Sequence, residues 1–447
     1  MIFNFNVPRN GLSPHCWVYS MEKMLNRAAP LVIALALPLV THAAETKFTF
    51  HKDVEPILQA RCQNCHRPGE AAPMSLLTYS DARPWAKAIK QAVLARKMPP
   101  WSADGSVGHF KNDRRLRPEE MDTLAKWADS GAAEGNVKDS PAPLQFSEGW
   151  AIGKPDAILE MPVPFEIPAN GVMDYQWILI PGFKDDKWIQ AFEVRPGNRA
   201  VVHHVAAFWR RAGSKWMAEV QPGVPVAKPS TAPENGASDG IVAEYVPGVP
   251  PLVMPKGYAM RLPAGADIML QVHYTPNGKA TEDRSRVGFI FADAPPEYQV
   301  MTTAVATVAL KIPPYEPNYR AQASTTFGTD LRILGINPHM HLRGKSAEVR
   351  ATYPDGRVEE LLRVPKYDFS WQITYEPEGD LKLPAGTKVE AVEFFDNSPN
   401  NAANPDPSKE VHWGDQTTDE MMVVYMHVAI PRDLDPRSLY RRVAYPK

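Results

Sequence analysis

Hydrophobic positions follow a helical period in the first part of the chain, over residues 47–137. Trp85, Ile89 and Val93 recur at four-residue spacing, which places them on one face of a helix. Ser80–Asp81 precede this run, and both residue types favour the cap of a helix. We therefore expect a helix that starts at this pair and buries the spaced apolar face.

A second helix is predicted to begin at Pro118 and to end near Gly131. Proline is favoured in the first helical turn, and Glu119–Glu120 follow it, where acidic side chains meet the positive end of the helix dipole. Apolar residues at 121, 124, 125 and 128 then share one face. Residues 138–146 contain two prolines and are interpreted as a linker.

The hydrophobic period changes to two from about residue 150, which is typical of β-strands. We expect two β-rich domains, over residues 147–308 and 309–447, divided near the proline-rich stretch 311–319. Residues 224–255 carry seven prolines and are expected to form a long excursion outside the core. The clearest strand predictions are the runs QWILI, ADIMLQVHY, VGFIF and MMVVYMHVAI.

Composition narrows the class of protein. A chain of 447 residues suggests about three domains. The formal charge of −2 argues against a general nucleic-acid-binding protein, because such binding needs a concentrated basic face. Hydrophobic residues make up 44%, which is enough for real cores and excludes wholesale disorder.

The N-terminus resembles an export signal. Lys23 and Arg27 precede a short apolar run and a small-residue cleavage pattern. We expect a signal peptide over residues 1–43, with the true start at Met21 or Met24, and a periplasmic or secreted mature protein. The apolar run is too short to span a bilayer comfortably, so no membrane span is expected in the mature form. A retained membrane anchor is the alternative.

The first chemical motif is Cys-x-x-Cys-His, formed by Cys62, Cys65 and His66. This spacing is the attachment signature of c-type haem, since two thiols one helical turn apart can reach the two vinyl groups on one haem edge. A redox pair or half of a zinc site is the alternative, but no second Cys pair follows to complete a zinc site. Residues 47–137 resemble a small cytochrome c domain, which implies a covalent haem with His66 as one axial ligand.

The second axial ligand is a choice among four residues. Met98 stands before two prolines just after a predicted helix, a context that resembles the methionine loop of cytochromes c. Met74, His109 and His51 remain open, but Met74 follows the motif so closely that the path to the opposite haem face is short. Met98 is the favoured ligand, and His/Met ligation would raise the reduction potential relative to two His ligands.

The β-rich part contains five histidines in three short apolar segments. Residues i and i+2 of a strand point to the same face, so His339 and His341 can chelate one metal. Adjacent residues point apart in a regular strand, so His203 and His204 can share a metal only where the backbone is bent or the strand ends. A lone strand histidine is usually a packed core residue, and it is the concentration of five that indicates metal binding. The clusters are His203-His204, His273, and His339-x-His341.

Imidazole suits zinc, copper, iron and nickel, so the histidines alone do not name the metal. A thioether ligand would indicate copper, because Cu(I) is soft. Met421 lies in the run Asp-Glu-Met near the C-terminus. Periodicity alone makes it a packing residue.

The ordered set of motifs His-His, Leu-Gln-Val-His-Tyr, His-x-His-Leu-x-Gly and Asp-Glu-Met resembles the copper type II, ascorbate-dependent monooxygenases, relatives of peptidylglycine α-hydroxylating monooxygenase and dopamine β-monooxygenase. The resemblance covers roughly residues 147–447. It implies two all-β sandwich domains of jelly-roll type, each with one copper ion. It also implies a first copper that stores an electron and a second that activates dioxygen and hydroxylates a C–H bond. The implied ligands are His203, His204 and His273 for the first copper and His339, His341 and Met421 for the second, with Tyr425 beside the second.

Departures from the family pattern bear on the substrate. The peptide-hydroxylating members carry an Arg two residues before the His-x-His pair, and Asn337 stands there in this chain. Val423 replaces an Asn found after the family's Asp-Glu-Met. A C-terminal glycine substrate is therefore not expected. The family's disulfides are also absent, because the mature chain keeps only Cys62 and Cys65.

Three functions fit these motifs. The first is an exported monooxygenase that hydroxylates a small-molecule or peptide substrate with dioxygen, while the fused haem passes electrons to the first copper. The electrons would come from a cytochrome- or quinol-linked donor or from an ascorbate-like reductant. The second is a non-enzymatic copper-binding or electron-transfer protein. The third is a zinc hydrolase, which a methionine ligand would disfavour.

Overall fold

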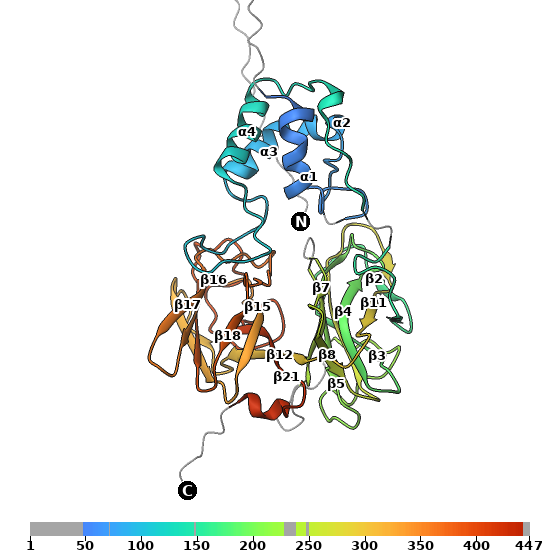
Figure 1. Cartoon of the computed structure of the whole chain (residues 1–447), viewed down its shortest axis with the longest axis vertical. Helices are drawn as coiled ribbons and strands as arrows, with labels where there is room; N and C mark the ends of the chain where they lie inside the picture. Colours follow the sequence, from blue (N-terminus) through green and yellow to red (C-terminus); the bar gives the residue numbers. More distant parts are fainter. Residues whose placement is uncertain (1–47, 71, 147–148, 228–237, 247–249, 441–447) are drawn as a thin grey trace, which may run out of the picture. The chain divides into compact units, whose positions relative to one another are not determined.

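The computed structural model describes residues 48–70, 72–146, 149–227, 238–246 and 250–440. The signal peptide expected over residues 1–43 lies outside this part of the chain. A short helical region comes first and is followed by mainly β-sheet domains (Figure 1). Within the described ranges, no helix combines the length and apolar character needed to cross a membrane.

The helical region is built as the hydrophobic pattern predicts around its last helix, α4. Pro118 lies in its first turn, and the Glu120 carboxylate accepts the Arg117 backbone N–H at 2.7 Å. Leu124 and Trp127 are buried in the core that α4 shares with its neighbours. The elements are a π-turn Phe50–Val54, α1 Glu55–Arg61, α2 Tyr79–Ala82, a 3₁₀ turn Arg83–Trp85, α3 Ala86–Leu94, α4 Pro118–Asp129 and a 3₁₀ turn Val137–Asp139.

The expected start of the other long helix is wrong by a few residues. Thr78 is the cap, because its hydroxyl accepts the Asp81 N–H at 3.1 Å, and Ser80 and Asp81 lie inside α2. Pro84 follows in a 3₁₀ turn, so the helix restarts as α3. This break rotates Trp85 out of the expected face, and its side chain is 42% exposed while Ile89 and Val93 are buried.

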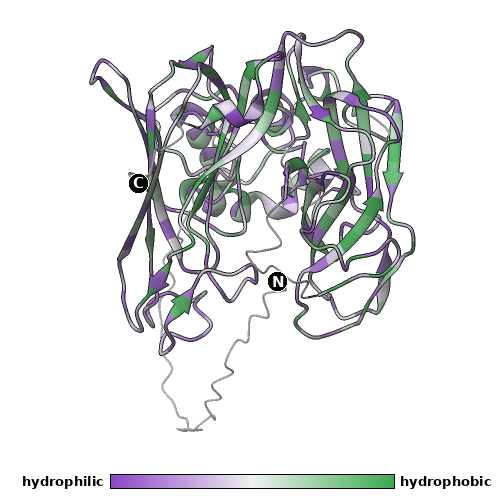
Figure 2. Ribbon diagram, turned by 90° about the horizontal axis from the view of Figure 1, so that it is seen from below, coloured by the Kyte–Doolittle hydropathy of each residue, from purple (hydrophilic) through white to green (hydrophobic). Residues whose placement is uncertain are grey.

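All four predicted strand runs form strands, namely β3, β9, β11 and β21. Most of the described strands belong to two four-stranded sheets and one nine-stranded sheet. The first four-stranded sheet has the order β3 Gln176–Pro181, β9 Asp267–Tyr274, β5 Val202–Arg210 and β6 Gly240–Tyr245. The second has the order β14 Tyr319–Thr326, β19 Lys388–Phe395, β16 Gly344–Thr352 and β17 Val358–Val364. Green hydrophobic and purple hydrophilic segments alternate along the ribbons in Figure 2.

The nine-stranded sheet runs past the expected domain boundary at 308/309. Its central strands β12 and β21 pair antiparallel from Tyr298↔Pro431 to Ala306↔Val423. Its order is β1 Ala157–Glu160, β11 Arg286–Phe291, β4 Lys187–Arg195, β8 Tyr258–Leu262, β12 Tyr298–Ala306, β21 Val423–Pro431, β15 Leu331–His339 and β18 Leu381–Leu383, with β7 Leu252–Val253 beside β4. Two short pairs complete the described strands, β2 Phe165–Ile167 with β10 Thr281–Asp283 and β13 Lys311–Ile312 with β20 Val411–His412.

Two separate hydrophobic cores lie against this shared sheet. One combines the β3-β9-β5-β6 sheet with β4, β8 and β11, and the other combines the β14-β19-β16-β17 sheet with β15. The strands β12 and β21 contribute to both, since Val300 and Ala429 belong to the first core and Val305 and Val428 to the second. The two β domains are therefore joined through a continuous backbone ladder.

The proline-rich stretch 224–255 is not wholly the excursion that its composition suggests. Strand β6 lies within it and pairs with β5. Ile241, Val242 and Ala243 of this strand are buried. The prolines flank this strand and are absent from it, so they leave its backbone ladder intact.

Candidate metal centres

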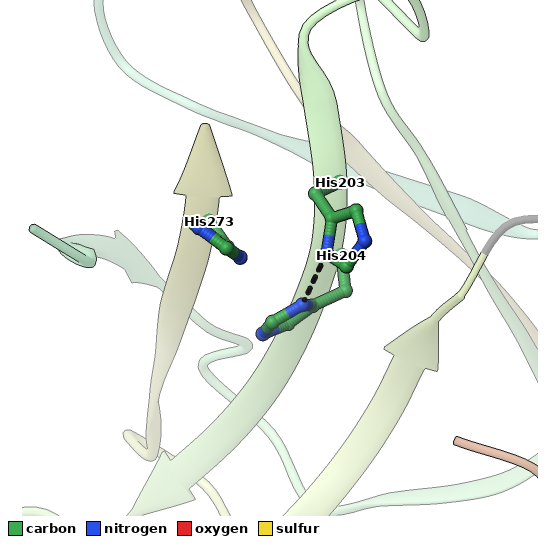
Figure 3. A group of neighbouring side chains, drawn as sticks. All are labelled: His203, His204 and His273. Atoms are coloured by element: carbon green, nitrogen blue, oxygen red, sulfur yellow. Dashed lines mark hydrogen bonds between the residues drawn. The ribbon is translucent and has the colours of Figure 1, made fainter. Parts of the chain in front are cut away.

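Three histidines of the first β domain meet at one point, the grouping that the resemblance described above implies. His204 of β5 pairs directly with His273 of β9, and the register of β5 shifts between Val202 and His204. That bulge places an extra residue, His203, in the strand, so both adjacent imidazoles can turn towards His273 (Figure 3). One ring nitrogen from each of the three histidines lies within 4.8 Å of the other two.

The electrostatics of this cluster suit a metal ligand set. Burial lowers the pKa of all three histidines, to about 3 for His273, and the positive charges of neighbouring histidines lower that of His204 further. The imidazoles are therefore neutral at physiological pH, the form that binds metals. Nδ1 of His273 is buried without a hydrogen-bond partner, whereas His203 and His204 share a hydrogen bond of 3.1 Å between their Nδ1 atoms.

Tyr175 connects this cluster to a loop of the second β domain. Its ring packs 4.8 Å from His273 and 5.4 Å from His204, measured between ring centroids. Its hydroxyl accepts a hydrogen bond of 2.9 Å from Thr417, and its backbone N–H donates to Gln416. Burial raises the pKa of Tyr175 to about 12, so the phenol is protonated.

The second pair, His339 and His341, forms a similar site at the end of β15. The ring centroids are 5.2 Å apart with the planes perpendicular. Nδ1 of His339 donates to the Gln372 side-chain oxygen at 2.6 Å, and Nδ1 of His341 donates to the Asp419 carbonyl at 3.1 Å. Each bond fixes the ring tautomer with the proton on Nδ1, so Nε2 is the nitrogen that could bind a metal.

The strand period places four apolar residues opposite this pair, facing a core, and the structure agrees with this only in part: Leu334, Ile336, Met340 and Leu342. Ile336 and Met340 are buried in the second core, as the strand period predicts. Leu334 instead packs against the first core, and Leu342 is only partly buried. A register shift between Ile333 and Gly335 breaks the alternation at Leu334, and β15 ends before Leu342.

Glu420 ties the neighbourhood of Met421 to this pair. Its fully buried carboxylate accepts the backbone N–H of His341 at 2.7 Å and that of Arg343 at 2.6 Å. Burial raises the pKa of Glu420 to about 8, although these N–H donors favour the ionised form. The next residue, Met421, is half-buried and precedes β21. Its thioether therefore belongs to the loop whose Glu420 is hydrogen-bonded to His341.

Tyr425 and Asn337 lie beside the second pair on neighbouring strands. They are partners in the β15–β21 register, and the Tyr425 ring centroid is 5.9 Å from that of His339. Burial raises the pKa of Tyr425. The Asn337 amide donates to the Thr374 hydroxyl at 3.1 Å, while its Oδ1 is buried without a partner. Asn337 therefore offers a free acceptor beside the second pair.

Phe369 touches both histidine clusters, a contact that no sequence pattern indicates. Its ring centroid lies 6.2 Å from His203, with the planes nearly parallel, and 5.9 Å from His341. The two clusters thus share one aromatic neighbour. Gln372 was equally hidden in the sequence, because an isolated polar residue after a turn carries no periodic signal.

The Cys-x-x-Cys-His residues form a tight turn after α1. The N–H groups of Cys65 and His66 donate to the Cys62 carbonyl at 3.1 and 2.9 Å. Burial raises the pKa of the Cys62 thiol to about 12 and lowers the pKa of His66. The His66 ring donates from Nδ1 to the Met74 carbonyl at 3.3 Å, which leaves Nε2 available as an axial ligand.

A cavity of about 1260 Å³ is lined by Arg61, the residue before Cys62, but by none of Cys62, Cys65 and His66. Its volume exceeds the roughly 300–1000 Å³ common for small-molecule sites. Met98, the favoured axial ligand, is among the lining residues. Met121 of α4 lines it too and was missed, because its helical spacing indicates only packing.

The other axial candidates have different surroundings. Met74 offers its carbonyl to the His66 ring and so lies on the side of His66. His51 is buried against Glu55 and Ser140, with Nδ1 contacts of 2.9 and 2.6 Å. His109 is exposed and its carbonyl accepts the Glu378 N–H. None of the three lines the cavity.

A small cavity of about 40 Å³ lies near the second pair, between residues of both β domains. Glu244 of β6 lines it together with Thr374, Glu376 and His427. Burial raises the pKa of Glu244 to about 7. A carboxyl group here was not expected, because β6 lies in the stretch that the proline content assigned to an excursion.

Comparisons with known proteins leave the family open. No known family profile and no curated protein matches the chain. The major capsid protein P2 from bacteriophage PM2 is similar over 62% of this chain and 98% of its own, with 10% identity and a TM-score of 0.24. PNGF-II is similar over 65% of this chain and 66% of its own, with 10% identity and a TM-score of 0.25. Likenesses this distant carry no argument about this chain.

Proposed function

We propose that the chain is an exported, haem- and copper-dependent monooxygenase that hydroxylates a C–H bond with dioxygen. The observation that carries the proposal is the pair of unequal imidazole sets, one of three histidines and one of two beside a methionine loop, in contact with the same Phe369 ring. A storage protein would not require this inequality. The resemblance to the copper type II monooxygenases supports jelly-roll sandwiches for residues 147–308 and 309–447.

The chain's own residues have defined tasks in this proposal. His203, His204 and His273 hold the first copper, and His339, His341 and Met421 hold the second. Copper at these positions would supply stored electrons and dioxygen activation. Gln372, Asp419 and Glu420 orient the second ligand set through the hydrogen bonds described above. Tyr425 offers a protonated phenol beside His339.

The helical region would hold the electron source. Cys62 and Cys65 are the attachment points for a c-type haem, His66 is one axial ligand and Met98 the other. The tight turn of Cys62, Cys65 and His66, in which the His66 ring uses Nδ1 on the Met74 carbonyl, supports this assignment. A haem domain tethered to the copper domains does not have to find them by diffusion, because the tether keeps its effective concentration near them high.

Oxygen incorporation tests the proposed activity. The copper-loaded protein is incubated with a reductant, isotopically labelled dioxygen and a panel of small amines, peptides and other C–H substrates, and products are analysed by mass spectrometry. We expect one labelled oxygen atom in a product with copper and none with zinc. Consumption of reductant without any labelled product across the panel would favour the second candidate.

That second candidate is a non-enzymatic copper and haem electron-transfer protein. One observation favours it: the cavity of about 40 Å³ that residues of both β domains line is far below the roughly 300 Å³ at which small-molecule sites begin, and none of the six proposed copper ligands lines it. Crystals or binding assays with product-sized ligands distinguish the two, because a monooxygenase must open this region to admit substrate.

A further inference from the structure

The cavity of about 40 Å³ that residues of both β domains line has polar side chains in its wall. They belong to Glu244 of β6, Thr374, Glu376, and His427 of β21. A buried water molecule needs roughly 10–15 Å³ of such space and two to four polar partners, so the cavity accommodates about three. It is therefore too small for a substrate and suits a short chain of water molecules.

Glu244 brings an unpaired carboxyl group to this cavity. Within the described ranges of the chain, no hydrogen bond or ion pair holds its side chain. Burial raises its pKa to about 7. A carboxyl group with this pKa gains and loses its proton near neutral pH, which is the property of an efficient proton donor.

The groups that face Glu244 leave it free to change its charge. Glu376 is paired with the Lys111 ammonium at 2.7 Å, and its side chain is 21% exposed, so it connects the cavity wall to solvent. Burial lowers the pKa of His427 to about 4 and raises the pKa of Tyr425, so both rings are neutral at pH 7. Among the described residues that line the cavity there is no lysine or arginine.

His427 adds an acceptor nitrogen to the wall of the cavity. The Thr302 hydroxyl donates to the Ile241 carbonyl at 3.2 Å, so its oxygen accepts the 3.1 Å hydrogen bond from Nδ1 of His427. The neutral ring therefore carries its proton on Nδ1, and Nε2 is its acceptor. Glu244 and His427 thus supply two different polar partners to a water molecule between them.

Thr374 connects the cavity to the second histidine set. Its hydroxyl accepts a hydrogen bond of 3.1 Å from the Asn337 amide. Asn337 and His339 lie on the same face of β15, about 7 Å apart along the strand. Oδ1 of Asn337 is buried without a partner in the described part of the chain, so it offers an acceptor between Thr374 and His339.

Packing alone gives no reason for a carboxyl group at this position. The ionised form of Glu244 is buried without an opposite charge, which costs stability near neutral pH. Glutamine has the same shape and carries no such cost. A carboxyl group that lends its proton accounts for the difference.

We propose that Glu244 and this cavity form a proton path that supplies the second copper centre. This inference rests on the proposed function, in which dioxygen, two electrons and two protons convert a C–H bond into C–OH and release one water molecule. The Glu244 carboxyl group releases its proton past Thr374 and Asn337 to the oxygen atom that leaves as water, and becomes a carboxylate. A proton from solvent, entering at Glu376, then restores the acid. Glu244 is a relay residue in this account, since it acts through the groups beyond it.

Reoxidation of the reduced protein by dioxygen tests the path without a C–H substrate. Each copper gives one electron, and dioxygen takes two electrons and two protons to form hydrogen peroxide. Haem- and copper-loaded protein is reduced under argon and mixed with dioxygen, and the return of the Cu(II) signal is followed by freeze-quench electron paramagnetic resonance. The wild-type rate should fall between pH 6 and pH 8, because the protonated fraction of Glu244 falls through its pKa of about 7.

Variants of Glu244 separate proton transfer from packing, with copper content measured for each. Glu244→Gln should slow reoxidation about 100-fold at pH 6, the lower end of what a positioned proton donor contributes, and remove the dependence on pH. Glu244→Asp keeps a carboxyl group and should restore part of the rate and of the pH dependence. Glu282→Gln, at an exposed position of β10, is the matched control and should leave the rate unchanged.

Infrared spectroscopy of the resting protein detects the proton on Glu244 without any reaction. The difference between spectra at pH 6 and pH 8 should contain a carboxylic-acid carbonyl band in the wild type that is missing in Glu244→Gln. Thr374→Val should keep this band and still slow reoxidation, because it removes the hydroxyl that lies beyond Glu244 on the path.

The outcomes separate the path from the proposed function. Equal reoxidation rates in Glu244→Gln and wild type, an unchanged rate in Thr374→Val, or no infrared band that depends on Glu244 would overturn the path. A wild type that meets these expectations and yet forms no labelled product with any C–H substrate would instead defeat the proposed hydroxylation, while the path to the second centre stands.

Discussion

Met421 is the residue on which the choice of metal depends most. The Glu420 carboxylate is hydrogen-bonded to the His341 backbone, and Met421 is the next residue. A copper ion at His339 and His341 would therefore have the Met421 thioether as the ligand candidate from this loop. Met421→Ile should remove a sulfur scatterer from the copper X-ray absorption spectrum of the reduced protein and abolish most oxygenation, while the haem spectrum stays intact. Persistence of the sulfur signal would assign the ligand to another methionine.

Glu244 carries a pH dependence that a single substitution exposes. Burial raises its pKa to about 7 in the folded protein, above the ordinary glutamate value of 4.5. The folded state therefore binds more protons than the unfolded state between these values, so stability is lost as pH rises from about 4.5 through 7. Glu244→Gln should raise the melting temperature at pH 8 and change it little at pH 4.

The result for Glu244 is read as a difference between two pH values. Thermal unfolding of both proteins at pH 4 and pH 8 gives four melting temperatures. A gain of equal size at both pH values would show that the substitution acts through packing and not through ionisation of the carboxyl group.

Single residues also mark what the sequence could and could not predict. The concentration of five histidines in three short segments indicated metal binding, but only the family resemblance grouped His203, His204 and His273 as one ligand set. The bent backbone that two adjacent ligands require is the bulge in β5. Phe369 and Gln372 were not identified, because their contacts join segments far apart in the sequence and no period connects them.

The loop of residues 413–421 links the two histidine sets. Thr417 binds Tyr175 at the first set, Asp419 binds His341 at the second, and Glu420 accepts two backbone N–H groups. Glu420→Ala leaves both buried N–H groups without their acceptor, at about 1–3 kcal/mol each. We expect a matching loss in the free energy of unfolding and copper binding reduced at the second centre only.

Denaturant unfolding and metal analysis check the Glu420 prediction. Glu420→Gln keeps one acceptor oxygen and serves as the control, with an intermediate loss of stability. Loss of copper from both centres in Glu420→Ala would contradict the prediction, because His203, His204 and His273 make no contact with Glu420 among the bonds described.

Helices and strands were predicted where one physical preference acts alone. Alternation located β3, β9, β11 and β21, and proline with two acidic residues located the start of α4. The start of α2 was misplaced because Thr78, Ser80 and Asp81 are all competent caps and only tertiary packing selects Thr78. Strand β6 was missed because its flanking prolines dominated the composition of the stretch.

At the scale of the whole molecule, the helical region and the β domains are expected to share one electron path. Replacing both Cys62 and Cys65 with serine should eliminate haem that stays attached on a denaturing gel, because no thioether bond can form. The β domains have their own cores and should keep their copper. Haem staining and metal analysis of protein matured in a host that attaches c-type haem check both statements.

The continuous nine-stranded sheet was not predictable from the sequence. The proline-rich stretch 311–319 suggested a division of the β-rich part, and separate cores do form. Pairing of β12 with β21 joins residues more than a hundred positions apart, and local patterns contain no information on such register. We expect the two β domains to unfold together because this ladder contributes to both cores.

The most direct measurement of the central claim is an anaerobic reductive titration of the mature protein, with haem followed by absorbance and Cu(II) by electron paramagnetic resonance. The account predicts one electron equivalent for the haem and one for each copper, with both Cu(II) signals lost, and one equivalent fewer in His204→Ala. Copper-free protein should take up the haem electron alone. Uptake of a single equivalent by the copper-loaded wild type, with Cu(II) signals unchanged, would contradict the account.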